Sequence, residues 1–169
     1  MSFEYKTYSS EKELNPIKKL MDVDLSEPYS IFTLRYFVRA WPQYCYLCYD
    51  GEEAIAAIIC KTEKRLKTNK NRGYIAMIAV KPEYRKRGIG SKLVKLVLDK
   101  MIEAKCDEVV LEAEASNQGA LKLYYQFGFI KDKRLIKYYM SGEDAFRLKL
   151  YLTNPSESSK EVVEEPSQD

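Results

Sequence analysis

The segment from Arg85 to Gly90 carries the residue types of a phosphate-binding turn. It reads Arg-Lys-Arg-Gly-Ile-Gly, an Arg-x-x-Gly-x-Gly spacing. Glycines let a backbone approach a ligand without a Cβ in the way, and arginines can pair with a diphosphate. Backbone N–H groups at the start of a helix also favour such an anion. The segment therefore predicts a diphosphate-binding turn, although by itself it is equally typical of a basic turn that only starts a helix.

The segments on either side supply the strand and the helix that this turn needs. Residues 74–80 form a mostly apolar run that suits a buried strand. Apolar residues then recur at helical spacing, at Ile89, Leu93, Leu96 and Val97. The turn lacks the Lys-Ser/Thr ending of a P-loop and the third glycine of a dinucleotide-binding fingerprint. It therefore belongs to neither of those nucleotide-binding types.

The composition limits the kinds of chemistry that the chain can perform. Its 169 residues suffice for one domain. We expect that domain to span 1–153, because 154–169 are polar, contain no aromatic residue and cannot bury enough surface to order themselves. The net charge of +3 is too small to indicate nucleic-acid binding by itself, and we expect no DNA partner. Because the chain contains no histidine, a His-based triad or His metal ligand is excluded, and we expect no metal.

The four cysteines are predicted to be free thiols in the core. Cys45-x-x-Cys48 lies in a strand-like run, where residues three apart point to opposite faces and cannot share a metal. Cys60 and Cys106 stand apart from this pair. Free buried thiols fit a reducing compartment, and no apolar run approaches the roughly 18 residues of a membrane span. We therefore expect no membrane partner and a cytosolic location, with the nucleus as a second compartment.

The predicted elements alternate as a mixed α/β domain with the order β-α-α-β-β-β-α-β-α-β-β. Asn15 is expected to cap the first helix, with Pro16 at its first position. Asp50-Gly51 predicts a hairpin turn, and Gly128 a left-handed helix cap. The predicted strands cover 3–8, 44–49, 54–60, 74–80, 109–115, 129–140 and 145–152. Residues 61–72 are expected to form a basic loop that is either merely solvated or contacts ribosomal RNA or an acidic partner.

This order, with Arg-x-x-Gly-x-Gly directly after the fourth strand, resembles the GNAT superfamily of acetyl-CoA-dependent N-acetyltransferases. Residues 117–129 are similar to the family's Asn-x-x-Ala-x-x-Leu-Tyr-x-x-x-Gly-Phe motif. The resemblance covers residues 3–152 and implies a central, mixed, mostly antiparallel sheet flanked by helices. Residues 25–31, Leu-Ser-Glu-Pro-Tyr-Ser-Ile, and 142–146, Gly-Glu-Asp-Ala-Phe, further resemble the catalytic subunits of NatC-type N-terminal acetyltransferases.

The resemblance implies acetyl-CoA as cosubstrate. The pantetheine arm would run along the fourth strand, whose backbone N–H groups would stabilise the oxyanion. Asn117 would reach this arm, although it could equally act only as a helix cap. The implied coenzyme-binding residues are Ile78, Ala79, Val80, Arg85, Lys86, Arg87, Gly88, Ile89, Gly90, Ser91, Asn117 and Tyr124.

The transfer needs a base and an acid. An α-amine titrates near 7.7–8.0 and a lysine near 10.4, so freeing them at pH 7 costs about 1 and about 4–5 kcal/mol. A weak base therefore suffices for a protein N-terminus. Without histidine it must be a carboxylate or a tyrosine, and Glu112, in an otherwise apolar strand, is the candidate, with Glu114 as the second choice. Tyr124 would protonate the CoA thiolate, although a helical tyrosine can also simply pack in a core.

The resemblance also implies the acceptor and the partners. The acceptor would be a nascent chain that begins with Met followed by Leu, Ile, Phe, Trp or Lys. The residues expected to bind it are Leu25, Glu27, Pro28, Tyr29, Tyr74, Tyr138 and Tyr139, although tyrosines are also common as ordinary strand residues. A large auxiliary subunit and a small Sm-like subunit would dock on apolar residues of the N-terminal third, such as Leu20 and Phe37.

Two other functions remain open on the same scaffold. One is acetylation of lysine or of a small amine, and the other is a non-catalytic acyl-CoA-binding module.

Overall fold

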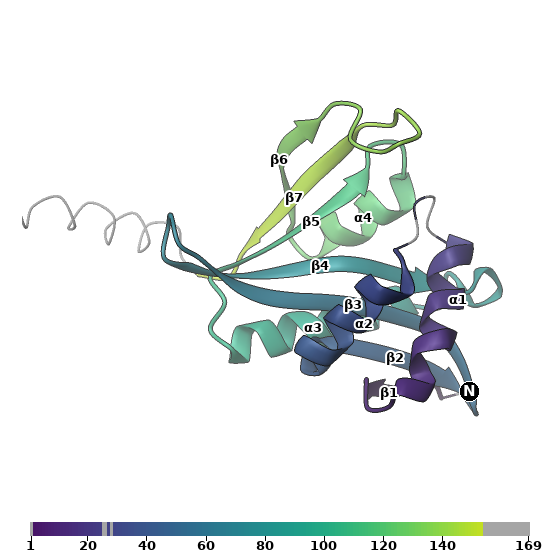
Figure 1. Ribbon diagram of the computed structural model, residues 1–169. Helices are drawn as coiled ribbons and strands as arrows, with labels where there is room; N and C mark the ends of the chain where they lie inside the picture. Colours follow the sequence, from purple (N-terminus) through teal and green to yellow (C-terminus); the bar gives the residue numbers. More distant parts are fainter. Residues whose placement is uncertain (1, 25–26, 28, 154–169) are drawn as a thin grey trace, which may run out of the picture.

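The chain folds around one seven-stranded sheet with helices on both faces (Figure 1). The computed structural model describes residues 2–24, 27 and 29–153, so Leu25, Pro28 and the segment 154–169 lie outside the described residues. The strand order is β1-β2-β3-β4-β5-β7-β6. All neighbours are antiparallel except β4 and β5. The predicted element order and the mixed, mostly antiparallel sheet are confirmed.

The elements have the following bounds. The helices are α1 (Leu14–Asp24), α2 (Ile31–Ala40), α3 (Ile89–Glu103) and α4 (Gln118–Gln126). The strands are β1 (Glu4–Thr7), β2 (Cys45–Asp50), β3 (Glu53–Arg65), β4 (Lys70–Val80), β5 (Glu108–Glu114), β6 (Ile130–Leu135) and β7 (Ala145–Tyr151). Within the described ranges no helix is both long and apolar enough to cross a membrane.

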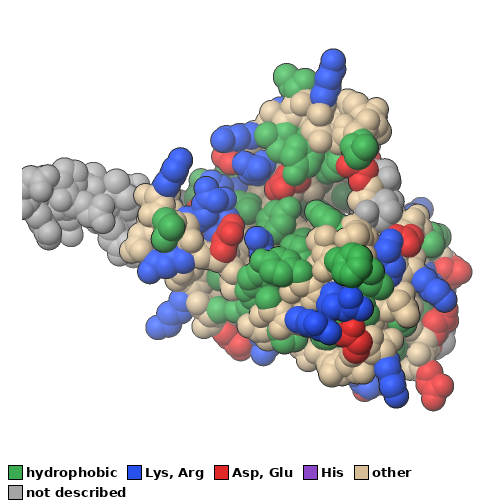
Figure 2. Space-filling model, viewed as in Figure 1, with side chains coloured by type: hydrophobic (Ala, Val, Ile, Leu, Met, Phe, Trp, Pro, Cys, Tyr) green, Lys and Arg blue, Asp and Glu red, His purple; other side chains and the backbone are tan. Residues whose placement is uncertain are grey.

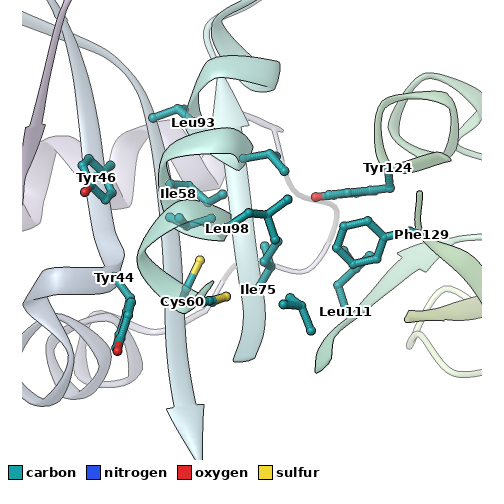
Figure 3. Close-up of a cluster of buried hydrophobic side chains, with 14 of the residues drawn as sticks. Tyr44, Tyr46, Ile58, Cys60, Ile75, Leu93, Leu98, Leu111, Tyr124 and Phe129 are labelled. Carbon is teal, nitrogen blue, oxygen red and sulfur yellow. The ribbon is translucent and has the colours of Figure 1, made fainter. Parts of the chain in front are cut away.

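Each face of the sheet has its own hydrophobic core. Side chains of α1 and α2 pack on one face, and side chains of α3 and α4 pack on the other, where they form the cluster in Figure 3. Cys45 belongs to the first core and Cys48 to the second, which confirms that the two thiols face opposite ways. All four cysteines are buried and free, as expected. The described residues hold no group of His, Cys, Asp or Glu side chains that could bind a metal ion.

Strands β4 and β5 pair over a short stretch and then separate. Their parallel ladder joins only Arg72–Tyr74 to Glu108–Val110, although β4 continues to Val80 and β5 to Glu114. The two strands therefore form a V, which Figure 1 shows opening toward α4. At its closed end the Nη2 of Arg72 lies 2.7 Å from the Oε2 of the buried Glu108. Because a buried carboxylate is costly without a partner, this pair ties the two strands together there.

The start of the first helix was predicted wrongly. Asn15 lies inside α1 and does not cap it. The chain instead enters through a 3-10 turn, Glu11–Glu13, capped by Ser10, whose hydroxyl accepts from the backbone N–H of Lys12. The carboxylate of Glu13 accepts from the N–H of Ser10 and completes a capping box. The Ser-x-x-Glu spacing is a helix-start signal in its own right, and it outcompetes Asn-Pro because it satisfies two N–H groups at once.

Two element lengths also differ from the prediction. Residues 61–72 are not a loop, because β3 continues to Arg65 and β4 begins at Lys70, so that only 66–69 turn. The backbone ladder needs no apolar side chains, and polar residues on both strands of this ribbon leave it intact. The strand predicted for 129–140 ends at Leu135, so Tyr138 and Tyr139 lie in the β6–β7 connection.

The predicted docking residues in the N-terminal third are wrong. Leu20 is 4% exposed and Phe37 is 7% exposed, because both point into the core beneath α1 and α2. The apolar residues that these helices do present to solvent are Val23, Phe32 and Tyr36, and Phe32 is 74% exposed. Figure 2 shows hydrophobic side chains gathered over this part of the molecule.

Candidate active site

The glycine turn leads directly into α3. Gly88 is the N-cap residue with φ +79°, a left-handed conformation that glycine adopts at little cost. Within the described residues no side chain caps this end of α3, so the N–H groups of its first turn, at Ile89, Gly90 and Ser91, have no side-chain acceptor. The structure thus confirms the predicted strand, turn and helix. It presents the backbone donors that an anion would need.

The basic side chains of the turn are exposed and partly ordered. Arg87 lies over the ring of Tyr84, with its Cζ 5.2 Å from the ring centroid. The Nε of Arg85 donates to the carbonyl of Val80 at 3.4 Å, and Lys86 adopts a left-handed φ of +63°. Val80 is the last residue of β4, so the turn lies at the open end of the V. Of its predicted neighbours on β4, Ala79 is buried and Ile78 half-buried.

The second motif forms α4 and its caps. Asn117 caps the helix, because its Oδ1 accepts from the N–H of Ala120 at 3.1 Å, and this contact leaves a role toward the coenzyme open. Tyr124 is 4% exposed and packs edge-on against Phe129. In Figure 3 its hydroxyl points away from α4 toward the side chains of α3 and β4. Burial raises the pKa of the Tyr124 phenol, which therefore stays protonated at neutral pH and can donate a proton.

The carboxylate of Glu112 is oriented by two phenols. Its Oε1 accepts from the hydroxyl of Tyr74 at 3.0 Å and from the hydroxyl of Tyr138 at 3.3 Å. The side chain is only 10% exposed, and among the described residues its buried Oε2 has no hydrogen-bond partner. A cation lies beside it, because the Nε of Arg147 is 3.7 Å from Oε2. Since buried polar atoms are normally satisfied, Oε2 is available to a substrate amine or a water.

Four tyrosines surround this carboxylate. Tyr29 comes from the α1–α2 connection, Tyr74 from β4, and Tyr138 and Tyr139 from the β6–β7 connection. Burial raises the pKa of all four phenols; the charge of Glu112 adds to this for Tyr29, Tyr74 and Tyr138, and that of Glu114 for Tyr139. The rings of Tyr138 and Tyr139 meet edge to face, with centroids 5.1 Å apart. The predicted acceptor tyrosines are therefore brought together around Glu112. The charge of Glu114 acts on one of them, Tyr139.

The two connections that carry these tyrosines are joined to each other. The carboxylate of Glu27 accepts from the backbone N–H of Met140. This contact links the α1–α2 connection to the β6–β7 connection beside Glu112. Glu27 thus lies among the predicted acceptor residues, whereas Leu25 and Pro28 lie outside the described residues.

The candidate base and the candidate acid lie on opposite faces of the sheet. Leu111 and Ala113 pack into the core beneath α3 and α4, so Glu112, between them on β5, points to the other face. Tyr124 belongs to the α3–α4 core. Between the two faces lies the V that the separation of β4 and β5 opens. A donor bound on one face and an acceptor bound on the other can therefore meet within the sheet.

Three residues of this site escaped the sequence prediction. Arg147 faces Glu112 because the two are directly paired between β7 and β5, a register that no local pattern reveals. Met140 contributes only its backbone. Asp144 accepts from the N–H of Lys137 and from the Nε of Arg134, both at 2.8 Å, and thereby fastens the β6–β7 connection. These two contacts hold the pKa of Asp144 below its ordinary value.

Comparisons with known proteins agree with this geometry. Residues 12–129 match the acetyltransferase (GNAT) family. N-alpha-acetyltransferase 30 of Xenopus laevis is 53% identical over 148 residues, which are 88% of this chain and 54% of that protein. N-alpha-acetyltransferase MAK3 of Arabidopsis thaliana is 51% identical over 152 residues, 90% of this chain and 79% of that protein. The chain therefore spans about half the length of the Xenopus relative and most of the Arabidopsis one.

A solved structure shows the same arrangement of elements. A chain in the crystal structure of the NatC complex bound to Gag peptide and CoA superposes with a TM-score of 0.87 and 44% sequence identity. The match covers 90% of this chain and 100% of that chain.

Proposed function

The chain belongs to the acetyltransferase (GNAT) family, and from that premise we propose that it is the catalytic subunit of a NatC-type N-terminal acetyltransferase. It transfers the acetyl group of acetyl-CoA to the α-amine of proteins that begin with Met followed by Leu, Ile, Phe, Trp or Lys. The observation that carries this proposal is the position of Glu112 and Tyr124 on the two sides of the V between β4 and β5. The identity to N-alpha-acetyltransferases supports it.

The coenzyme occupies the α3–α4 side of the V. The NatC structure that this chain resembles was solved with CoA, which supports the same cosubstrate here. The diphosphate binds the backbone N–H groups of residues 87–91, where α3 begins without a side-chain cap. The pantetheine arm follows β4 beyond Tyr74, where this strand no longer pairs with β5. Free N–H groups of β4 then stabilise the oxyanion of the tetrahedral intermediate.

The chemical step joins the two faces. Glu112 removes a proton from the α-ammonium, directly or through one water, and the neutral amine attacks the thioester carbonyl. The C–N bond forms, its nitrogen gives up the second proton to water, and the C–S bond breaks. Tyr124 donates its proton to the departing CoA thiolate and regains one from solvent. A carboxylate suffices as base because removing the proton from an α-ammonium at pH 7 costs only about 1 kcal/mol.

A peptide panel tests this assignment. Peptides that begin Met-Leu, Met-Ile, Met-Phe, Met-Trp and Met-Lys should gain one acetyl group at the N-terminus, detected by mass spectrometry. N-terminally blocked peptides with an internal lysine should not react. The opposite pattern would make the protein a lysine or small-amine acetyltransferase.

A second experiment separates the enzyme from a non-catalytic acyl-CoA-binding module. The double variant Glu112→Gln, Tyr124→Phe should bind CoA in a calorimeter as the wild type does but lose turnover. A module without catalysis would bind CoA and show no turnover in either form.

Auxiliary subunits dock on the exposed face of α1 and α2 in this proposal. Val23, Phe32 and Tyr36 present apolar surface there. The resemblance to a chain of the NatC complex supports subunit assembly, and we assign the partners as a large auxiliary subunit and a small Sm-like one. The double variant Phe32→Ser, Tyr36→Ser should lose co-purification with the large subunit. The fold should stay intact, because both side chains are largely exposed.

The β3–β4 hairpin contacts the ribosome in this proposal, in the cytosol. Lys64, Arg65 and Lys67 are exposed near its tip, and among the described residues none of them forms an ion pair. Contacts of such side chains with RNA phosphates weaken as the salt concentration rises, because binding releases counterions from the RNA and this release is then less favourable. Replacing the three by Ala should reduce both ribosome binding and its salt dependence. Equal binding by the variant would remove the hairpin from this role.

A further inference from the structure

A chain of contacts connects the β2–β3 turn to the loop at the start of α3. Tyr84, at the end of the 3-10 turn Pro82–Tyr84, donates its hydroxyl to the Oδ2 of Asp50 at 2.6 Å. The Cζ of Arg87 lies 5.2 Å from the centroid of the same ring. Phe3 packs edge-on against this ring, with centroids 5.8 Å apart. Tyr84 therefore couples a turn of the sheet to an exposed arginine.

The loop that carries Arg87 combines exposed side chains with a left-handed backbone. Residues 85–88 are exposed, and both Lys86 and Gly88 have left-handed φ values, of +63° and +79°. A non-glycine residue keeps such a conformation only where its surroundings impose it. The hydrogen bond to Asp50 raises the pKa of Tyr84 to about 12, so the phenol remains a donor throughout the physiological range. The contact is thus available at any pH at which the enzyme would work.

We propose that Asp50 and Tyr84 are positioning residues for the coenzyme, which hold the guanidinium of Arg87 in place to grip the diphosphate. This inference rests on the proposed function, because the anion is the diphosphate of CoA. Asp50 and Tyr84 do not touch the coenzyme and act through Arg87. A free arginine side chain loses rotamer entropy when it binds a ligand, whereas stacking on an aromatic ring orders it beforehand. We call the contacts from Asp50 through Tyr84 to Arg87 the relay. The relay therefore favours coenzyme binding and leaves the chemical step unchanged.

Two single variants break the relay at different points. Tyr84→Phe keeps the ring contacts with Phe3 and Arg87 but removes the hydroxyl, and Asp50→Ala removes its acceptor. Each should raise the Kd for CoA about 3- to 10-fold, because ordering one otherwise free arginine side chain on binding has a cost of this size. Glu52→Ala is the matched control, because it removes an exposed carboxylate from the same turn without touching Tyr84. It should leave the Kd unchanged.

The relay must also depend on Arg87 and on the diphosphate. In an Arg87→Ala background, Tyr84→Phe should cause no further loss of CoA affinity, because coupled residues are not additive. With S-acetylpantetheine, a donor without the diphosphate, Tyr84→Phe should have the kcat/KM of the wild type. An unchanged Kd in Tyr84→Phe, a full additional loss in the Arg87→Ala background, or an equal loss with S-acetylpantetheine would each overturn the relay.

The relay and the proposed function fail in different ways. If wild-type protein gives no calorimetric heat with CoA, the proposed function is wrong and the relay has no ligand. If wild-type protein binds CoA and acetylates Met-Leu peptides, and both variants behave in the same way, only the relay is wrong.

Discussion

The turn at the start of α3 and the tyrosine cluster around Glu112 lie on opposite faces of the sheet and are built in different ways. The turn, with α4 beside it, comes from two continuous segments, 80–91 and 117–128, and its main donors are backbone N–H groups. The cluster gathers side chains from the α1–α2 connection, β4, β5 and the β6–β7 connection. The first depends on local conformation, the second on how distant elements pack.

This difference has a consequence for mutation. A backbone site loses only part of its affinity when a supporting side chain such as that of Arg87 is changed, and it fails completely only when a new side chain blocks it. A side-chain site loses function in steps, as each phenol or carboxylate is removed. Changes on one face should therefore leave the other face working, and the following variants test that independence.

The largest effect is expected from Gly90→Trp on the coenzyme face. The indole would cover the N–H groups of the first turn of α3 and raise the Kd for acetyl-CoA at least 100-fold, about 2.7 kcal/mol. Gly90→Ala is the control, because a Cβ there would lie 3.6 Å from Leu123, an ordinary contact. Calorimetry measures both. Normal affinity in Gly90→Trp would mean that the diphosphate binds elsewhere.

Glu112→Gln should separate the two faces most clearly. Gln keeps an oxygen that can accept from Tyr74 and Tyr138 but cannot take a proton, so kcat should fall about 10²–10⁴-fold with CoA affinity unchanged. Steady-state kinetics with a Met-Leu peptide measure it. Glu114→Gln, two residues along the same face, is the matched control and should change kcat less than about threefold. The reverse result would make Glu114 the base.

A smaller effect is expected from Tyr138→Phe. The variant loses one hydrogen bond to Glu112, at 3.3 Å, which is worth about 0.5–1.5 kcal/mol. The kcat/KM for the peptide should fall about 2- to 10-fold, while the KM for acetyl-CoA stays the same. Tyr151→Phe, at the far end of β7, serves as the control. A changed KM for acetyl-CoA would show that the faces are coupled.

The smallest effect concerns Asp144, which fastens the β6–β7 connection. Its folded-state pKa lies below the ordinary 3.8, because it accepts from the N–H of Lys137 and from Arg134. A carboxyl with a depressed pKa stabilises the fold above its unfolded pKa and loses that contribution as the pH falls through the folded value. The wild type should therefore lose stability more steeply than Asp144→Asn below about pH 4. Thermal unfolding from pH 7 to pH 2.5 checks this, and parallel curves would contradict it.

The parts of the fold that the sequence predicted well are those with local signals. The turn from Arg85 to Gly90, the helix after it and the cap at Gly128 all follow from glycine position and helical periodicity. The prediction failed where two local signals competed, as at Ser10 and Asn15. It failed again where polar residues formed a strand, because between Lys61 and Arg72 the pairing partner decides the conformation and not the side chains.

The candidate site likewise has features that depend on local sequence and contacts that depend on tertiary structure. The sequence by itself determined the order of the elements, the uncapped glycine turn at the start of α3 and the residue types available for acid–base chemistry, since these depend on residues close together in the chain. Only the tertiary structure decided that Arg147 faces Glu112, that Glu27 binds the backbone of Met140 and that Asp50 reaches Tyr84. Those contacts join residues 34 to 113 positions apart. Strand register and loop packing, which minimise the energy of the whole sheet, set such distances, and no short segment contains that information.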